Sequence, residues 1–404
     1  MRASRVLQKC LSESLNPMHA LRSGVLLRSV EALVEGRRLT LIDVARSWPG
    51  AERVRAPLKA FDRLLSNRHL HAERERIYAD MARWLLRSAR PVIVIDWSDL
   101  KADKAWCLLR AAVPIGGRTL PILDMVFPGC EQGAPAAERR FLQRLRMLVP
   151  ENSRPIVVTD AGFRSPWFRA VSAIGWDWVG RLRHRTLVKL VDVDNRDEAW
   201  VPSRALYPLA STTPRDLGLM DTVRNAPWVC RMVVYGKAPK GRKHRNRRSR
   251  DQVARSSSSR KAAAREREPW LLVASPELAH LNARQITTLY ARRMQIEASF
   301  RDLKSHRYGQ GFEDSLTRSG RRLEILLLVN ALAAFASWLA GMACEATGVA
   351  HWLSPVHSKR KLYSTLRVGR EALVRQWPME PIAQWLDRLR SLPPQVINQM
   401  VAPT

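Results

Sequence analysis

Two short apolar runs that each end on an aspartate constrain the fold of this chain more than any other feature. The first run spans 91–96 and ends on Asp96, and the second spans 155–160 and ends on Asp160. Apolar runs of this length, rich in valine and isoleucine, predict buried strands. In open α/β sheets, ligands bind outside the carboxyl ends of the strands. We therefore expect an α/β fold with both aspartates at a functional edge of its sheet.

A third carboxylate lies in a segment with helical periodicity. The segment carries four polar residues at offsets of three, four and seven positions: Tyr290, Arg293, Glu297 and Lys304. At about 100° per residue, these offsets place them within roughly 60° of one another on a single helix. Arg301 extends this polar stripe. An apolar face is predicted beside it, formed by Leu289, Ile296, Phe300 and Leu303. The pattern suits one metal-binding acid presented among cations to a polyanionic substrate.

The three acids fit the requirements of metal-dependent phosphoryl transfer. Mg²⁺ takes oxygen ligands and is usually held by a few carboxylates together with substrate phosphate. Two such ions, about 3.5–4 Å apart, activate the attacking oxygen and stabilise the leaving oxygen. We predict that Asp96, Asp160 and Glu297 are the catalytic residues and hold two Mg²⁺ ions, for which Mn²⁺ substitutes. Asp99 is the alternative first ligand, but Asp96 directly ends the apolar run.

Together these segments resemble the DDE transposases, whose catalytic core is RNase H-like. The spacing around Glu297 matches the Y-x2-R-x3-E-x6-K signature of the insertion-sequence-4 group of bacterial transposases. The segment 96–100 is similar to the D-x-[TS]-x-L segment of that group, and 160–168 is similar to its second-aspartate segment. The resemblance covers about residues 90–345.

The resemblance implies an RNase H-like core, a mixed sheet with flanking helices, that is interrupted by a β-rich insertion domain and preceded by a helical DNA-binding domain. We expect strands near 92–96, 105–113, 119–126, 155–159 and 177–182, with helices near 136–148 and 165–173. The expected parts are a DNA-end-binding domain (1–88), the first part of the core (89–185), the insertion (186–274), the second part of the core with the glutamate helix (275–348) and a C-terminal helical region with dimer contacts (349–404).

The N-terminal region has the pattern of two short helices across a tight turn. Thr40 begins a predicted helix that runs to Ser47 through a capping-box-like start. A second helix is predicted from 54 to 65, with an outward basic ridge formed by Arg55, Lys59 and Arg63. A basic second helix after a tight turn suits helix-turn-helix-like DNA binding. The alternative is an ordinary helical bundle with a solvated ridge.

The charge balance predicts a nucleic-acid partner. The chain has 68 basic against 37 acidic residues, a net charge of +31, which implies a polyanion held by salt-dependent attraction. Within the predicted insertion, 237–268 holds thirteen Lys or Arg and three acids. We expect a mobile loop that contacts DNA phosphates. Trp270 follows it, and the resemblance implies that an aromatic residue there stacks on an extruded base; the alternative is a core tryptophan.

The remaining features bear on the compartment. The five cysteines show no metal-binding spacing, which suits a reducing environment. The apolar stretch 325–344 is long enough to cross a bilayer, but Asn330, Ser337 and Gly341 interrupt it, and we expect a buried core helix. The N-terminus lacks the apolar run of a signal peptide. We therefore expect a cytoplasmic, nucleoid-associated bacterial protein with no membrane partner.

These observations predict a transposase that binds the ends of its own insertion sequence, cleaves them and joins them to target DNA. Its partners would be double-stranded DNA and, by resemblance, a second copy of the chain. Tyr290, Arg293, Arg301 and Lys304 are the predicted phosphate contacts. The alternatives are a non-catalytic DNA-binding regulator or decayed copy, and an RNase H-like nuclease. Transfer of a cut end into new DNA separates a transposase from a nuclease.

Overall fold

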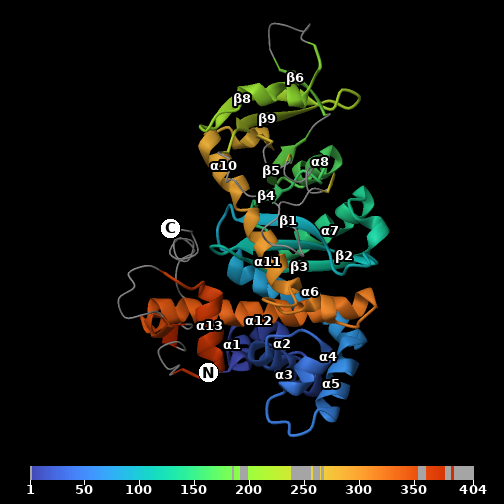
Figure 1. Ribbon diagram of the computed structural model, residues 1–404, viewed down its shortest axis with the longest axis vertical. Coiled ribbons are helices and arrows are strands. Elements are labelled where there is room, and N and C mark those ends of the chain that lie inside the picture. The colour runs from blue at the N-terminus through green and yellow to red at the C-terminus, as the bar shows by residue number, and fades with distance from the viewer. Residues whose placement is uncertain are drawn as a thin grey trace. The chain divides into compact units, whose positions relative to one another are not determined.

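The chain has a mixed α/β fold that is compatible with an RNase H-like core (Figure 1). The computed structural model describes residues 2–183, 186–191, 199–237, 256–257, 264, 268–353, 361–377 and 384–385. The chain divides into two compact units. The first unit comprises Met1–Pro155 and Met294–Thr404, and the second comprises Ile156–Arg293. The predicted basic loop 237–268 and the segment beyond 377 lie mostly outside the described residues, and the five-part division of the chain stays a prediction.

The first unit begins with a series of helices. They are α1 (Ala3–Cys10), α2 (Ser12–Leu15), α3 (Ala20–Gly36), α4 (Leu41–Arg46), α5 (Arg55–Leu65) and α6 (Arg68–Leu85). The two helices predicted across a tight turn are confirmed as α4 and α5. At the start of α4, the hydroxyl of Thr40 accepts a hydrogen bond of 3.2 Å from the backbone N–H of Asp43, as a capping residue does.

An antiparallel meander follows, made of β1 (Val92–Asp99), β2 (Trp106–Pro114) and β3 (Thr119–Pro128). A 3₁₀ turn (Gly129–Glu131) and α7 (Pro135–Leu148) come next. The prediction that the first strand ends at Asp96 is wrong. Its pairing with β2 continues from Asp96, opposite Arg110, to Asp99, opposite Cys107. Asp96, Ser98 and Asp99 remain in the strand because main-chain pairing with β2 does not require apolar side chains.

One long helix forms the centre of the first unit. α12 (Gly320–Ala346) packs against α1, α3, α5, α6, α13 (Thr365–Val374) and β3, and it lies between the N-terminal helices and the strands in Figure 1. Its length and composition alone would suit a membrane span, but 94% of its most apolar 18-residue stretch is buried inside the protein. The predicted core helix is therefore confirmed. The other elements of this unit are α11 (Met294–Lys304) and 3₁₀ turns at Phe312–Asp314 and Val349–Leu353.

The second unit is a mixed sheet with two helices packed on it. Its elements are β4 (Ile156–Thr159), α8 (Ser165–Ala173), β5 (Asp177–Leu182), β6 (Leu187–Leu190), β7 (Val201–Pro202), β8 (Arg215–Thr222), β9 (Trp228–Tyr235), β10 (Trp270–Ala274) and α10 (Ala283–Ala291), with 3₁₀ segments at Ser203–Leu209 and Pro276–Leu278. β4 and β5 are parallel. β10 then pairs with both β5 and β9 in antiparallel fashion. β6 and β9 belong to the same sheet as β4 and β5; a separate β-rich insertion domain stays a prediction.

The crossing of α12 and α13 depends on glycine. A Cβ atom at Gly369 would lie 1.7 Å from the backbone oxygen of Ser337, and one at Gly341 would lie 2.0 Å from that of Thr365. Because both obstacles are main-chain atoms, the helices would have to separate to admit any side chain.

We expect Gly369→Ala to lower the free energy of unfolding by about 1–3 kcal/mol through overpacking. The matched control is Gly24→Ala in α3, where an added Cβ meets nothing within 4 Å. That variant should gain about 0.5–1 kcal/mol from helix propensity. Thermal and urea unfolding of the two variants measures the difference. Equal unfolding curves would contradict the close crossing.

Candidate active site

The first candidate ligand lies within β1. Asp96 is 8% exposed and faces Arg110 across the strand pair. Arg110 is itself held by a bidentate ion pair to Asp124, with both N–O distances at 2.7 Å and both residues buried. Asp99, the alternative, is half-buried, and its carboxylate lies 3.6 Å from the Nζ of Lys104. Asp96 keeps the preference because it directly ends the apolar run, and the choice between the two aspartates stays a prediction.

The second candidate in this unit is carried by α11. Glu297 is exposed, whereas Ile296, Phe300 and Leu303 are buried. The predicted amphipathic character is therefore confirmed for this helix. Arg301 and Lys304 follow Glu297 by four and seven residues on the same face.

The prediction of one continuous helix from Tyr290 to Lys304 is wrong. α10 ends at Ala291 and α11 begins at Met294. Between them, the N–H groups of Arg292 and Arg293 donate to carbonyls three residues earlier, at 3.2 and 3.0 Å, which is the bonding of a tight 3₁₀ turn. No glycine or proline marks this turn in the sequence. Tyr290 and Arg293 thus belong to the second unit, and Glu297, Arg301 and Lys304 to the first.

Polar contacts hold α11 against the strands of the first unit. The backbone N–H of Thr119 donates to the Oγ of Ser299 at 2.8 Å, and Arg118 pairs with Asp302 at 2.5 Å. At the end of the helix, the Nζ of Lys304 donates to the Oγ of Ser98 and to the carbonyl of Asp99, each at 3.1 Å. Lys304 therefore fixes the helix of Glu297 to the strand of Asp96. The Cζ of Arg110 also lies 5.4 Å from the centre of the Phe300 ring.

The third candidate, Asp160, follows β4 in the second unit. Its Oδ1 accepts a hydrogen bond of 2.7 Å from the N–H of Gly162, as in an Asx turn. A side chain at Gly162 would come within 2.9 Å of the same oxygen, so glycine permits this approach. Within the described part of the chain, Oδ2 has no hydrogen-bond partner. One oxygen therefore orients the carboxylate and leaves the other for a ligand.

Aromatic and basic groups surround Tyr290 in the same unit. Burial raises the pKa of Tyr290; the charges of Arg293 and Arg181 lower it, and that of Asp160 raises it. The Cζ of Arg293 lies 5.9 Å from the centre of the tyrosine ring, and the ring of Trp270 meets it edge-on at 5.0 Å. Sequence reasoning missed Arg181, which is 8% exposed. An arginine inside the apolar strand 177–182 was the available signal.

Trp270 also lines a hollow of the second unit. It borders a cavity of about 510 Å³ together with Tyr235, Lys237, Arg284 and Thr287. The Nζ of Lys237 lies 5.3 Å from the centre of the indole ring. Trp270 is half-buried, so part of its ring surface faces this cavity. The tryptophan is therefore neither a fully buried core residue nor a free surface residue.

The predicted basic ridge of α5 belongs to the first unit. Arg55, Lys59 and Arg63 are exposed, as predicted, whereas Pro57, Phe61, Leu64 and Leu65 are buried. Arg301 is also exposed and makes no side-chain hydrogen bond or ion pair within the described residues. These four cations are free to meet solvent or a polyanion.

The predicted metal ligands are divided between the units, with Asp96 and Glu297 in the first and Asp160 in the second. Among the described residues, no three His, Cys, Asp or Glu side chains form a ready metal site. The convergence of the three acids therefore stays a prediction. As a donor set they offer only carboxylate oxygens, which fits a hard divalent ion.

The two cations of α11 should behave differently on substitution. Lys304→Met removes two hydrogen bonds from a charged donor and should lower the free energy of unfolding by about 1–3 kcal/mol. Arg301→Met, on the same helix face, should leave it nearly unchanged, because Arg301 is exposed and unbonded. Urea denaturation of both variants checks this. Equal losses would show that Lys304 does not tie α11 to β1.

Comparison with known proteins identifies the family of the chain. No curated protein matches the chain by sequence. Residues 87–335 match the family described as "Transposase DDE domain", a span that includes Asp96, Asp160 and Glu297. The match covers more than half of the 404 residues. The chain therefore belongs to the DDE transposases and is an enzyme of DNA transposition.

Proposed function

We propose that this transposase belongs to the insertion-sequence-4 group and moves its own element by cut and paste. In this proposal it binds the element ends, cleaves them by phosphoryl transfer and joins them to target DNA. The observation that carries the proposal is the attachment of α11 to β1. The hydrogen bonds of Lys304 at 3.1 Å to Ser98 and to Asp99 fix the helix of Glu297 on the strand of Asp96.

DDE transposases as a group depend on divalent metal ions. We propose that Asp96, Asp160 and Glu297 hold two Mg²⁺ ions, with Mn²⁺ as a substitute. When bound, such ions supply Lewis-acid stabilisation of the charge that develops during phosphoryl transfer. Each of the three proposed ligands lies on a segment that hydrogen bonds hold in place. Asp96 is on a paired strand, Asp160 is oriented by Gly162, and Glu297 is on a helix with polar ties.

The neighbouring polar residues would position DNA phosphates. Because burial raises the pKa of Tyr290, its phenol is protonated at neutral pH and can donate a hydrogen bond to a phosphate oxygen. Arg293 packs over the tyrosine ring and adds positive charge there. Arg301 is exposed and available to a phosphate. Lys304 acts mainly by fixing α11 to β1 through its hydrogen bonds to Ser98 and Asp99.

The wider DNA contact would come from the N-terminal helices and the basic loop 237–268. The exposed cations of α5 form a ridge on one helix face. Each phosphate contact contributes about 0.9 to the slope of log affinity against log salt. Lys59→Ala should therefore lower that slope by about one, and an unchanged slope would place the ridge away from DNA. We further propose a homodimer in the synaptic complex and a cytoplasmic, nucleoid-associated location.

Trp270 would stack on a base extruded from the DNA end. The cavity beside its ring, lined by Lys237 and Arg284, supports this role because an unpaired base needs an aromatic face and its phosphate needs a cation.

A DNA end that carries 2-aminopurine at the first base tests this role. Its fluorescence should rise when the natural chain binds and extrudes the base. The rise should be lost with Trp270→Ala, since stacking contributes about 1–3 kcal/mol per base, and kept with Trp352→Ala, another partly exposed tryptophan. Fluorescence anisotropy would verify that both variants still bind the DNA. A rise that survives Trp270→Ala refutes the stacking role.

Excision of a marked element in bacterial cells tests the proposed activity. The element carries the flanking DNA of the gene as its ends, and the natural chain is compared with Glu297→Gln. Loss of one metal carboxylate should reduce excision by several orders of magnitude, as for a group that acts only in the transition state. Glu313→Gln, an exposed glutamate outside the site, should excise normally.

Three other outcomes are informative. Equal excision by the natural chain and Glu297→Gln would remove Glu297 from the site. No excision by any variant would favour a decayed copy or a DNA-binding regulator. Excised ends that never join a target plasmid would indicate a nuclease.

A further inference from the structure

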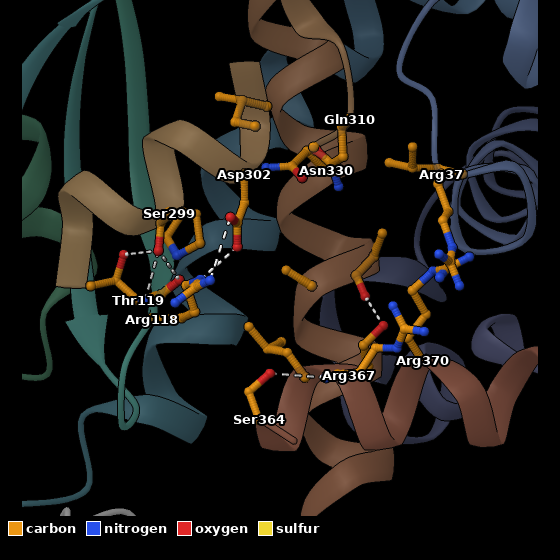
Figure 2. Close-up of a pocket in the computed structure, with 18 of the residues that line it drawn as sticks. Arg37, Arg118, Thr119, Ser299, Asp302, Gln310, Asn330, Ser364, Arg367 and Arg370 are labelled. Carbon is orange, nitrogen blue, oxygen red and sulfur yellow. Dashed lines mark hydrogen bonds and ion pairs between the residues drawn. The ribbon is translucent and has the colours of Figure 1, made fainter. Parts of the chain in front are cut away.

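A second polar cavity lies in the first unit, on the side of α11 that carries Ser299 and Asp302 (Figure 2). It has a volume of about 270 Å³ and is walled by α3, β3, α11, α12 and α13. Five arginines line it: Arg37, Arg110, Arg118, Arg367 and Arg370. Two of them have carboxylate partners of their own, since Arg110 pairs with Asp124 and Arg118 with Asp302.

The other three arginines share a single acid. The carboxylate of Glu371 is 6% exposed and lies within 4 Å of four guanidinium groups: Arg37 at 2.9 Å, Arg367 at 3.1 Å, Arg375 at 3.3 Å and Arg370 at 3.9 Å. Of these four arginines, Arg37, Arg367 and Arg370 line the cavity, so positive charge is in excess over the Glu371 carboxylate there. Burial, together with the charge of Arg37, lowers the pKa of Arg370 to about 10. The crowded cations would be stabilised by a further anion.

Two of these arginines are fixed by the backbone around them. Arg37 ends α3 in the left-handed conformation, with φ of 64°, which is uncommon for a residue with a side chain. Arg370 donates from Nε to the carbonyl of Val34 at 2.8 Å and from Nη2 to that of Glu35 at 3.1 Å. Segments more than 330 residues apart are thus joined at the arginine side of the cavity.

Two amide side chains, Gln310 and Asn330, also line the same cavity. Asn330 interrupts the apolar helix α12 and is only 7% exposed, yet its side chain makes no hydrogen bond within the described residues. The Oε1 of Gln310 is buried and also lacks a partner there. The two side chains lie next to each other in Figure 2. Buried polar groups are normally hydrogen-bonded, so the side chain of Asn330 and the unpaired Oε1 of Gln310 indicate a ligand with polar edges.

The rest of the wall is apolar. Leu33, Val34, Pro121 and Leu303 contribute to it. Guanidinium groups recognise phosphate, amide side chains pair with the edges of bases, adenine above all, and apolar walls cover a flat ring. A volume just below the usual range of small-molecule sites, about 300–1,000 Å³, admits no more than one nucleotide.

We propose that this cavity binds one nucleotide, with its phosphate on the Arg37, Arg367 and Arg370 side and its base against Asn330 and Gln310. The nucleotide is either free or the 5′-phosphorylated end of a DNA strand, since both offer the same phosphate and base. The bound ligand would contact α11 through Ser299 and Asp302, on the helix that carries Glu297. It would thus act as a positioning ligand for that helix.

Calorimetric titration of the full chain with deoxyadenosine monophosphate tests the site. The double variant Arg37→Gln/Arg367→Gln should weaken binding by about tenfold or more, because two charged phosphate contacts are lost. The two side chains are 51% and 48% exposed, so the fold should survive, which thermal unfolding verifies. Arg28→Gln removes one exposed charge from α3 away from the cavity and should leave the affinity unchanged.

A second variant separates the two halves of the site. Asn330→Leu should weaken binding of the deoxynucleotide and leave that of inorganic phosphate unchanged. Absence of nucleotide binding by the natural chain, equal weakening by Arg28→Gln, or equal effects of Asn330→Leu on both probes would overturn the proposal.

Competition identifies the source of the nucleotide. Displacement by a 5′-phosphorylated tetranucleotide, but not by its unphosphorylated form, assigns the site to a DNA end. Displacement by neither assigns it to a free nucleotide. Equal displacement by both tetranucleotides would indicate non-specific electrostatic binding of DNA strands and would overturn the proposal. These titrations need no metal ion and no transposition, so their failure leaves the catalytic assignment untouched.

Discussion

Burial of the long apolar helix α12 is the constraint on which the first unit depends. A helix of 27 residues that is apolar on all sides must be covered on all sides. The N-terminal helices cover one flank, β3 another and α13 a third, the last through glycine contacts at 341 and 369. The basic N-terminal helices are therefore part of the same folded body as the strand that carries Asp96. A DNA-binding surface on α5 would be built on the core of the enzyme itself.

Ion pairs hold the candidate catalytic helix, α11, in position. The net charge of +31 means that acidic residues are fewer than basic ones. Several of these acids form ion pairs with arginines inside the protein. Asp124 holds Arg110 beneath the ring of Phe300, and Asp302 holds Arg118 at the start of β3. With Lys304 on β1, these contacts surround α11 with fixed partners. The same excess of basic residues makes the cavity beside Ser299 and Asp302 of α11 positively charged. Four arginines lie within 4 Å of the Glu371 carboxylate, and three of them line this cavity.

The sequence predicted the parts of the fold that depend on local pattern. The apolar runs before Asp96 and Asp160 are strands, the stretch near 325–344 is a buried helix, and Ile296, Phe300 and Leu303 face inward. Prediction from the sequence failed where the structure depends on contacts between segments that are distant in the chain. β1 continues past Asp96 because β2 pairs with it, and the helix break at 292–293 has no local breaker. The cavity between α3 and α13 joins residues 334 positions apart, which no periodicity reveals. Spacing and resemblance predict the role of the three acids, and a shared metal site of Asp96, Asp160 and Glu297 is the central claim of this account.

Iron-directed backbone cleavage tests most directly whether Asp96, Asp160 and Glu297 share one metal site. Fe²⁺ binds to oxygen sites that accept Mg²⁺ and, with ascorbate and peroxide, produces hydroxyl radicals that cut the nearest backbone. We predict cuts in three short segments, around 96, 160 and 297, which excess Mg²⁺ suppresses and Glu297→Gln abolishes. Cuts around 96 and 297 without any near 160, or cuts that Glu297→Gln leaves intact, would contradict a shared metal site of Asp96, Asp160 and Glu297.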